Sequence, residues 1–186
     1  MGKSTVARMF REAGVPVFDA DAEVRRLQGP RGALVERIGE RFPGTVNAGI
    51  LDRERLAARV LEDPDELAAL EAIVHPAVRD ARKAFMDQNA EAPALLFEIP
   101  LLFETGGETE FDQVIVVSAP AEVQRARVLK RPGMTEEKLA SILARQVNDE
   151  EKRERADFVV ETGGDLPTTE AQVRDILACL GLRSSR

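Results

Sequence analysis

Short apolar runs alternate along this chain with segments of helical periodicity, and this alternation constrains the fold more than any other feature. The runs span residues 15–18, 94–99, 114–117 and 158–160, and the longer ones have the continuity of strands that are buried on both faces. Strands that alternate with helices form a parallel sheet that is wrapped by helices on both sides. The sequence therefore predicts an α/β domain.

The tetrapeptide Gly2-Lys3-Ser4-Thr5 precedes a segment with apolar residues at helical spacing. It matches the last positions of the phosphate-binding loop G-x-x-x-x-G-K-[ST], in which backbone N–H groups and a helix N-terminus hold phosphate oxygens. We therefore predict that these four residues bind ATP, that Lys3 acts in catalysis at the β- and γ-phosphates, and that Ser4 is a ligand of Mg²⁺. The alternative is an accidental match in a short N-terminal peptide.

Acidic residues lie at the ends of two predicted strands: Asp19 and Asp21 after the first, and Glu98 in the second. Ligands of parallel sheets bind at the carboxyl ends of the strands, so these residues and the loop are expected to form one site. A carboxylate there can accept or orient the proton of an attacking hydroxyl, which makes Asp21 the catalytic candidate. Aspartate is also a good helix N-cap, and one aspartate can serve each role. Glu98 either holds Mg²⁺ through water or lies beside a turn.

Two arginines and the single histidine complete the set of candidate residues. Arg127 and Arg131 are four residues apart and share one face of a helix predicted over residues 121–131. Guanidinium groups suit the charge that develops on a transferring phosphoryl group, so both are candidate catalytic residues; a solvated basic surface is the alternative. His75 has no histidine partner for a metal site, and it is either a packed residue or a contact to substrate.

The composition excludes several classes of protein. The 186 residues carry a net charge of −7, whereas nucleic-acid-binding domains are normally basic. One cysteine permits no internal disulfide and is typical of a reducing compartment, and no apolar stretch approaches the roughly 20 residues that cross a bilayer. We therefore expect a cytoplasmic protein that binds neither nucleic acid nor membrane. Since Trp and Tyr are absent, the chemistry must use Lys, Arg, acids, hydroxyls and backbone groups.

Turn and capping signals define further local expectations. Asp63 followed by Pro64 predicts a helix start, and Pro76 is expected to bend this helix or to begin a new one that continues to about residue 89. Residues 45–51 are expected to form a turn or a small excursion. Residues 149–155 are expected to be a charged stretch that leads into the last strand.

Taken together, these residues resemble the dephospho-CoA kinase family, and the resemblance spans essentially the whole chain. The motifs that carry it are Gly2-Lys3-Ser4-Thr5, Val17-Phe18-Asp19-Ala20-Asp21, Leu51-Asp52-Arg53, His75-Pro76, Ile99-Pro100-Leu101-Leu102-Phe103-Glu104, Gln124 with Arg127 and Arg131, Lys152, and Ala156-Asp157-Phe158-Val159-Val160. Singly these motifs are weak, but in this order and spacing they are specific.

The resemblance implies an enzyme that uses ATP to phosphorylate the ribose 3′-hydroxyl of dephospho-CoA, the last step of coenzyme A synthesis. It implies a P-loop fold like that of the nucleoside monophosphate kinases, as a single domain over residues 1–186. Within it, residues of approximately 29–90 would form a helical CoA-side subdomain and approximately 131–155 a lid. The protein is expected to be a monomer or a weak homo-oligomer.

By matching position, Asp21 would be the base or the orienting carboxylate, and Arg127 and Arg131 would border the lid. The residues on the acceptor side would be Asp19, Arg53, His75, Pro100 and Leu101.

The chain departs from the family pattern in two places. A strand and a Gly-rich segment precede Gly2 in the family, so we expect the natural chain to begin upstream of Met1. Thr162 stands where many members carry Asn, which alters a contact near the adenine. Two rival functions are also compatible with the sequence. One is another small-molecule or nucleotide kinase of the same fold, and the other is a nucleotide-binding protein made inactive by its incomplete loop.

Overall fold

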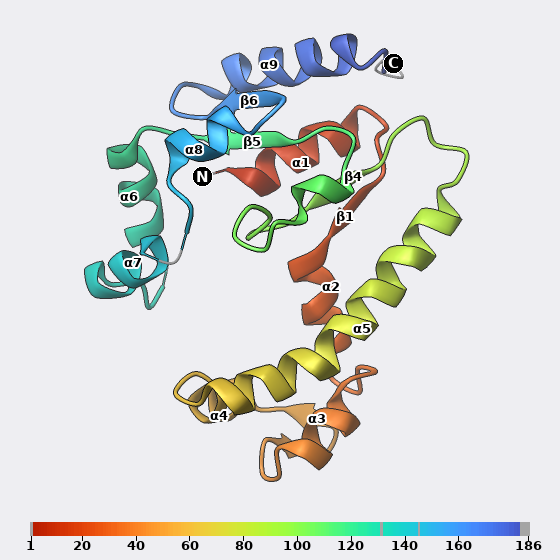
Figure 1. Cartoon of the computed structure of the whole chain (residues 1–186), viewed down its shortest axis with the longest axis vertical. Helices are drawn as coiled ribbons and strands as arrows, with labels where there is room; N and C mark the ends of the chain where they lie inside the picture. Colours follow the sequence, from red (N-terminus) through yellow and green to blue (C-terminus); the bar gives the residue numbers. More distant parts are fainter. Residues whose placement is uncertain (1, 131, 145, 183–186) are drawn as a thin grey trace. The chain divides into compact units, whose positions relative to one another are not determined.

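The computed structural model describes residues 2–130, 132–144 and 146–182 and divides into two compact units (Figure 1). The first unit combines Met1–Val17 with Glu98–Arg186, and the second is Phe18–Phe97. Helices and strands alternate along the chain, which confirms the expected α/β class.

The first unit contains a parallel pair of strands with helices packed against it. Its elements are α1 (Lys3–Glu12), the 3₁₀ helix η1 (Gly107–Glu110), β5 (Ile115–Ser118), α6 (Ala121–Leu129), α7 (Glu136–Leu143), α8 (Asp149–Glu154), β6 (Phe158–Glu161) and α9 (Leu166–Cys179). Strands β5 and β6 run parallel from the pair Ile115–Phe158 to the pair Ser118–Glu161. Because parallel strands end at the same edge, the loops that follow β5 and β6 lie close together.

Helices α1 and α9 contact one another, and α9 also lies along β6 (Figure 1). Each buries a stripe at helical spacing: Val6 and Phe10 lie on that of α1, and Val173 and Leu177 on that of α9. The Gly14 that follows α1 has φ +93°, as expected for a glycine that ends a helix in the left-handed conformation. This packing fixes the first turn of α1 beside the end of β6.

The second unit is mainly helical. Its elements are β1 (Val17–Asp19, of which Val17 belongs to the first unit), α2 (Ala20–Leu27), α3 (Val35–Arg41), β2 (Val46–Asn47), β3 (Ile50–Leu51), α4 (Arg53–Val60), α5 (Pro64–Gln88) and β4 (Leu96–Glu98, of which Glu98 belongs to the first unit). Its core contains the buried residues Leu27, Leu34, Val35, Ile38, Phe42, Leu51, Leu56 and Val60, and α5 packs against them.

Three aromatic rings fix the strands of the second unit against α5. Strands β1 and β4 are neighbours in a two-stranded sheet. Phe18 of β1 and Phe97 of β4 lie 5.9 Å apart between ring centroids, and Phe85 of α5 lies 5.4 Å from the first and 5.8 Å from the second. Tilted and edge-on rings at these separations attract one another beyond the area that they bury.

The structure adds detail to the sequence-based expectation at three points. Residues 45–51 form an antiparallel hairpin, β2–β3, in which Val46 pairs with Leu51. The helix after Asp63 is one element, α5, with Pro76 inside it, so no new helix begins there. The charged residues 149–155 contain helix α8, which Asn148 caps by accepting a hydrogen bond from the N–H of Glu151. The other predicted elements are present with their ends shifted by a few residues.

Within residues 2–130, 132–144 and 146–182, no helix is both long enough and apolar enough to span a membrane.

Candidate active site

The first turn of α1 has the features of an anion-binding helix end. Gly2 precedes the helix with φ +88°, a left-handed conformation that a glycine adopts without the strain of a side chain. Among the described residues, no side chain caps this end and no acid occupies its first turn. The N–H groups of Thr5 and Val6 bond to the Gly2 carbonyl, whereas the earlier amides lack partners within the helix. The free amides and the half-buried Lys3 thus suit a phosphate.

The two predicted metal ligands lie together. The Ser4 hydroxyl donates a 2.9 Å hydrogen bond to Oε1 of Glu98, the last residue of β4. A hydroxyl and a carboxylate are the hard oxygen ligands that Mg²⁺ prefers, so the pair fits this ion. Among the described residues, no group of three or more His, Cys, Asp or Glu side chains could hold a metal. A Mg²⁺ ion would therefore take most of its ligands from water and from phosphate, as is usual in nucleotide sites.

A cavity of about 330 Å³ opens beside the first turn of α1. Its walls come from α1, α6, the segment that joins β6 to α9, and the start of α9. The residues that line it are Gly2, Thr5, Arg127, Thr162, Gly164, Asp165, Leu166 and Thr169. Its volume lies at the lower end of the range for small-molecule sites and suits a nucleoside.

Arg127 forms one wall of this cavity because Thr162 holds its guanidinium group. Nη1 donates to Thr162 Oγ1 at 3.2 Å and Nη2 donates to the Thr162 carbonyl at 2.7 Å. The same hydroxyl donates to the carbonyl of Ser118 at 3.0 Å, so the ends of β5 and β6 fix the position of the arginine. Arg127 therefore lines the same cavity as Gly2 and Thr5 in the phosphate-binding turn of α1. Its predicted companion Arg131 lies outside the described residues.

The two aspartates after the first strand have different surroundings. Asp19 caps α2, since its Oδ1 accepts a 2.8 Å hydrogen bond from the N–H of Ala22. Its Oδ2 also lies 3.8 Å from Nη2 of Arg25. Asp21 is exposed in the first turn of α2, where the helix dipole stabilises a carboxylate. Asp19 is therefore the helix cap, and the exposed carboxylate of Asp21 is available to contact a substrate.

The remaining acceptor-side candidates lie on several elements. Arg53 begins α4, and its Nη2 donates to the carbonyl of Arg25 at the end of α2. His75 is exposed on α5. Pro100 and Leu101 lie in the turns that follow β4, with Leu101 exposed. Arg53 is thus connected through Arg25 to Asp19.

Sequence reasoning did not single out the loop after β6 as part of a cavity wall. Gly164 and Asp165 lie between the last strand and α9, and Leu166 begins α9, so the rule that ligands bind at strand ends could have indicated them. The contact between Arg127 and Thr162 joins residues 35 positions apart and depends on the pairing of β5 with β6. No local pattern in the sequence carries that information.

Comparison with known proteins identifies relatives of this chain. A sequence model of the dephospho-CoA kinase family matches residues 1–168. The dephospho-CoA kinase of Novosphingobium aromaticivorans is 56% identical over 186 residues, which cover 100% of this chain and 92% of the relative. That of Mesorhizobium japonicum is 56% identical over 180 residues, which cover 95% of this chain and 90% of the relative.

Solved structures share the fold. A crystal structure from Thermus thermophilus is 40% identical, with a TM-score of 0.79 over 96% of this chain and 92% of that one. The dephospho-CoA kinase from Campylobacter jejuni, 23% identical, has a TM-score of 0.65 over 96% of this chain and 91% of that one. On the family match over residues 1–168 and the identity along the full length, this chain belongs to the dephospho-CoA kinase family.

Proposed function

We propose that this protein transfers the γ-phosphoryl group of ATP to the ribose 3′-hydroxyl of dephospho-CoA, giving coenzyme A and ADP. The observation that carries the proposal is the first turn of α1, where Lys3 and the Ser4–Glu98 pair lie beside a nucleoside-sized cavity. Phosphoryl transfer depends mainly on positioning and charge stabilisation, and these are the groups that supply both. The reducing compartment suggested by a single cysteine supports a cytoplasmic location.

The nucleotide-binding residues lie in the first unit. The adenosine part of ATP occupies the cavity, and its phosphates lie over the N–H groups at the start of α1. Lys3 contacts the β- and γ-phosphates and Arg127 offsets the charge that develops during transfer. Ser4 and Glu98 would hold Mg²⁺, which neutralises phosphate charge when it is bound.

The acceptor-binding residues that we assign in the second unit are Asp21, Arg53 and His75. The 3′-hydroxyl oxygen forms a bond to the γ-phosphorus as the bond from that phosphorus to the β–γ bridging oxygen breaks, and ADP leaves. Asp21 orients the hydroxyl and accepts its proton. Arg53 and His75, which belong to the helical subdomain of approximately residues 29–90, contact the CoA side. Pro100 and Leu101 also lie on the acceptor side. Residues of approximately 131–155 form the lid that excludes water from the transfer.

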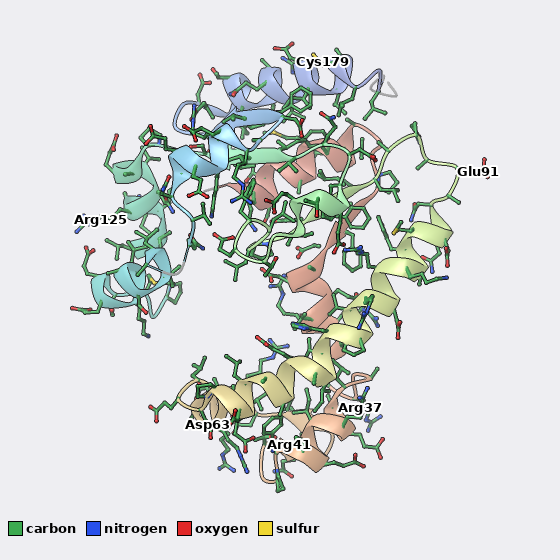
Figure 2. All side chains as sticks on the ribbon, viewed as in Figure 1. Arg37, Arg41, Asp63, Glu91, Arg125 and Cys179 are labelled. Atoms are coloured by element: carbon green, nitrogen blue, oxygen red, sulfur yellow. The ribbon has the colours of Figure 1, made fainter. Side chains whose placement is uncertain are left out.

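The test replaces the proposed base. We expect Asp21→Asn to lower kcat by roughly 10²–10⁴-fold in an assay that couples ADP release to dephospho-CoA phosphorylation, the usual contribution of a general base. Asp63→Asn is the matched control: Asp63 caps α5 (Figure 2), and asparagine caps a helix equally well. Its kcat should stay within about threefold of the parent.

Three results would contradict the proposal. If Asp21→Asn loses no more activity than Asp63→Asn, Asp21 does not handle the proton. If nucleoside monophosphates or shikimate are phosphorylated faster than dephospho-CoA, the protein is a different kinase of the same fold. An inactive nucleotide-binding protein would show no turnover with any acceptor, and Lys3→Ala would then have no activity to remove.

A further inference from the structure

Helix α8 is attached to the rest of the first unit by a buried ion pair. Nζ of Lys152 lies 2.7 Å from Oε1 of Glu104, and the two side chains are only 10% and 11% exposed. The same carboxylate oxygen accepts a 3.0 Å hydrogen bond from the N–H of Val147. One oxygen thus fixes both α8 and the backbone that enters it, against the segment that follows β4.

Further contacts hold both ends of α8. At its start, the hydroxyl of the buried Ser118 donates a 2.6 Å hydrogen bond to Asp149. At its end, the guanidinium carbon of Arg155 lies 4.9 Å from the ring centroid of Phe103, and the guanidinium group pairs with Glu108. Because these contacts reach β5 and the segment 103–108, α8 belongs to the rigid part of the unit.

The neighbouring helix α7 is held differently. One of its contacts with α6 is an ion pair between Arg125 and Glu136, whose side chains are 61% and 51% exposed, and Arg125 points outward from α6 in Figure 2. Exposed pairs of this kind contribute little to stability. Ile142 and Leu143 on α7 are also exposed, at 42% and 44%, and Leu139 is the one described residue of this helix that is buried. Segments with few buried contacts open most readily, so α7 is the part of the predicted lid that can move.

Stability alone does not explain the buried pair. The surrounding cluster of Phe103, Val114 and Val116, with Val147 and Ala156 against it, is already apolar. Apolar side chains in place of a buried ion pair are often as stable or more stable. Oε2 of Glu104 is buried as well and has no hydrogen-bond partner among the described residues, which adds a cost. The ion pair fixes the positions of Val147 and α8, which apolar side chains would not do.

We propose that Glu104 and Lys152 are positioning residues for the kinase reaction, which hold α8, the C-terminal part of the predicted lid, against the Pro100–Glu104 turn. The inference rests on the proposed function, because it assigns the pair to that reaction. It also divides the lid predicted over residues 131–155: α7 moves, and α8 is its fixed base. Loss of the pair would displace the lid base and the acceptor-side Leu101 together.

The charge state of the pair agrees with this role. Burial works to raise the pKa of Glu104, but hydrogen bonds from Lys152 and from backbone N–H groups outweigh it and hold this pKa below its ordinary value. Glu104 is therefore ionised at neutral pH and the ion pair is fully formed there.

The experiment compares Glu104→Gln, Lys152→Met, and the double variant Glu104→Met with Lys152→Met. Each single variant is expected to lower kcat/KM for dephospho-CoA by roughly 10- to 100-fold, the range for slight misplacement of reacting groups. The double variant removes both charges, so its thermal midpoint should return towards that of the parent while kcat/KM stays low. Lys83→Met is the control, since Lys83 forms an exposed pair with Asp87, and it should change neither quantity.

Hydrogen exchange supplies a readout that needs no turnover. In both single variants and in the double variant, exchange should rise in peptides that cover 99–108 and 147–155, with α9 unchanged. The inference is overturned if the double variant recovers kcat/KM together with its midpoint, or if exchange rises evenly across the first unit. If the parent protein does not phosphorylate dephospho-CoA, the proposed function fails, whereas the exchange pattern still tests the fixed position of α8.

Discussion

At the scale of single residues, separate motifs meet where their chemistry requires it. Ser4 and Glu98 are 94 positions apart, were each predicted as metal ligands on independent grounds, and lie within hydrogen-bond distance. The two roles predicted for the aspartates also separate, since Asp19 caps a helix and Asp21 is exposed. The loop motif and the strand ends made these placements predictable. The link from Arg127 to Thr162 was not predictable, because it depends on tertiary pairing.

Lys3 is expected to act on the transferring phosphoryl group more than on the fold. Lys3→Met should lower kcat by roughly 10²–10³-fold, the range for loss of one group that stabilises developing charge. The thermal midpoint should stay close to that of the parent because Lys3 is only half-buried at the start of α1. Steady-state kinetics and thermal unfolding measure both quantities. Arg8→Met, which removes an exposed positive charge from the same helix, is the control; an equal loss of kcat there would exclude a specific role for Lys3.

Acid should weaken the contribution of Glu104 to stability. Its pKa in the folded protein lies below the ordinary value of 4.5, so its ionisation stabilises the fold fully above that pH and loses this effect as the pH falls through the lowered pKa. The difference in unfolding free energy between the parent and Glu104→Gln should therefore be constant from about pH 5 to pH 8 and shrink at more acid pH. Urea unfolding at several pH values measures it. A difference that grew on acidification would contradict the assignment.

At the scale of elements, the sequence-based expectations hold where an apolar pattern decides the structure and fail where tertiary contacts decide it. Helix α8 has only six residues and no apolar stripe; its one buried residue is Lys152, so periodicity could not reveal it. Pro76 does not end α5, because Ile73, Val74 and Ala77 around it pack against the core of the second unit. That burial offsets the hydrogen bond that a proline removes from a helix.

The loop between β6 and α9 should be sensitive to a single methyl group. A Cβ atom on Gly163 would lie 2.5 Å from Cδ of Pro120, whose ring is too stiff to yield, so Gly163→Ala must shift the loop that lines the cavity. We expect the KM for ATP to rise roughly tenfold, a loss of about 1.4 kcal/mol in binding, with the KM for dephospho-CoA little changed. The two KM values measure this.

The compensating variant keeps that prediction testable. Pro120→Ala removes the ring atoms that the new methyl group would meet, so the double variant should regain most of the affinity for ATP. If Gly163→Ala weakens ATP binding and Pro120→Ala restores none of it, the steric explanation is wrong.

At the scale of the whole molecule, each unit has its own core, and a defect in one core should stay within that unit. Ile38 is fully buried in the second unit, so Ile38→Ala should cost about 2–5 kcal/mol of unfolding free energy there. Ile50→Ala is the control because Ile50 is 57% exposed, and it should cost less than about 0.5 kcal/mol.

Two measurements follow the effect of Ile38→Ala. Urea unfolding gives the loss of stability, and titration of the folded variant with a non-hydrolysable ATP analogue gives its affinity for the nucleotide. That affinity should match the parent, since the residues assigned to ATP belong to the first unit. A parallel loss of affinity would show that the two cores depend on one another.

The ring contact between Phe18, Phe85 and Phe97 has an experimental use. Because the chain contains neither tryptophan nor tyrosine, its near-ultraviolet absorption comes from phenylalanine alone. A Phe85→Trp substitution would therefore introduce a single tryptophan whose fluorescence no other tryptophan or tyrosine overlaps. Its neighbours Phe18 and Phe97 each directly precede an acid at a strand tip, Asp19 and Glu98, so its emission would monitor both tips optically.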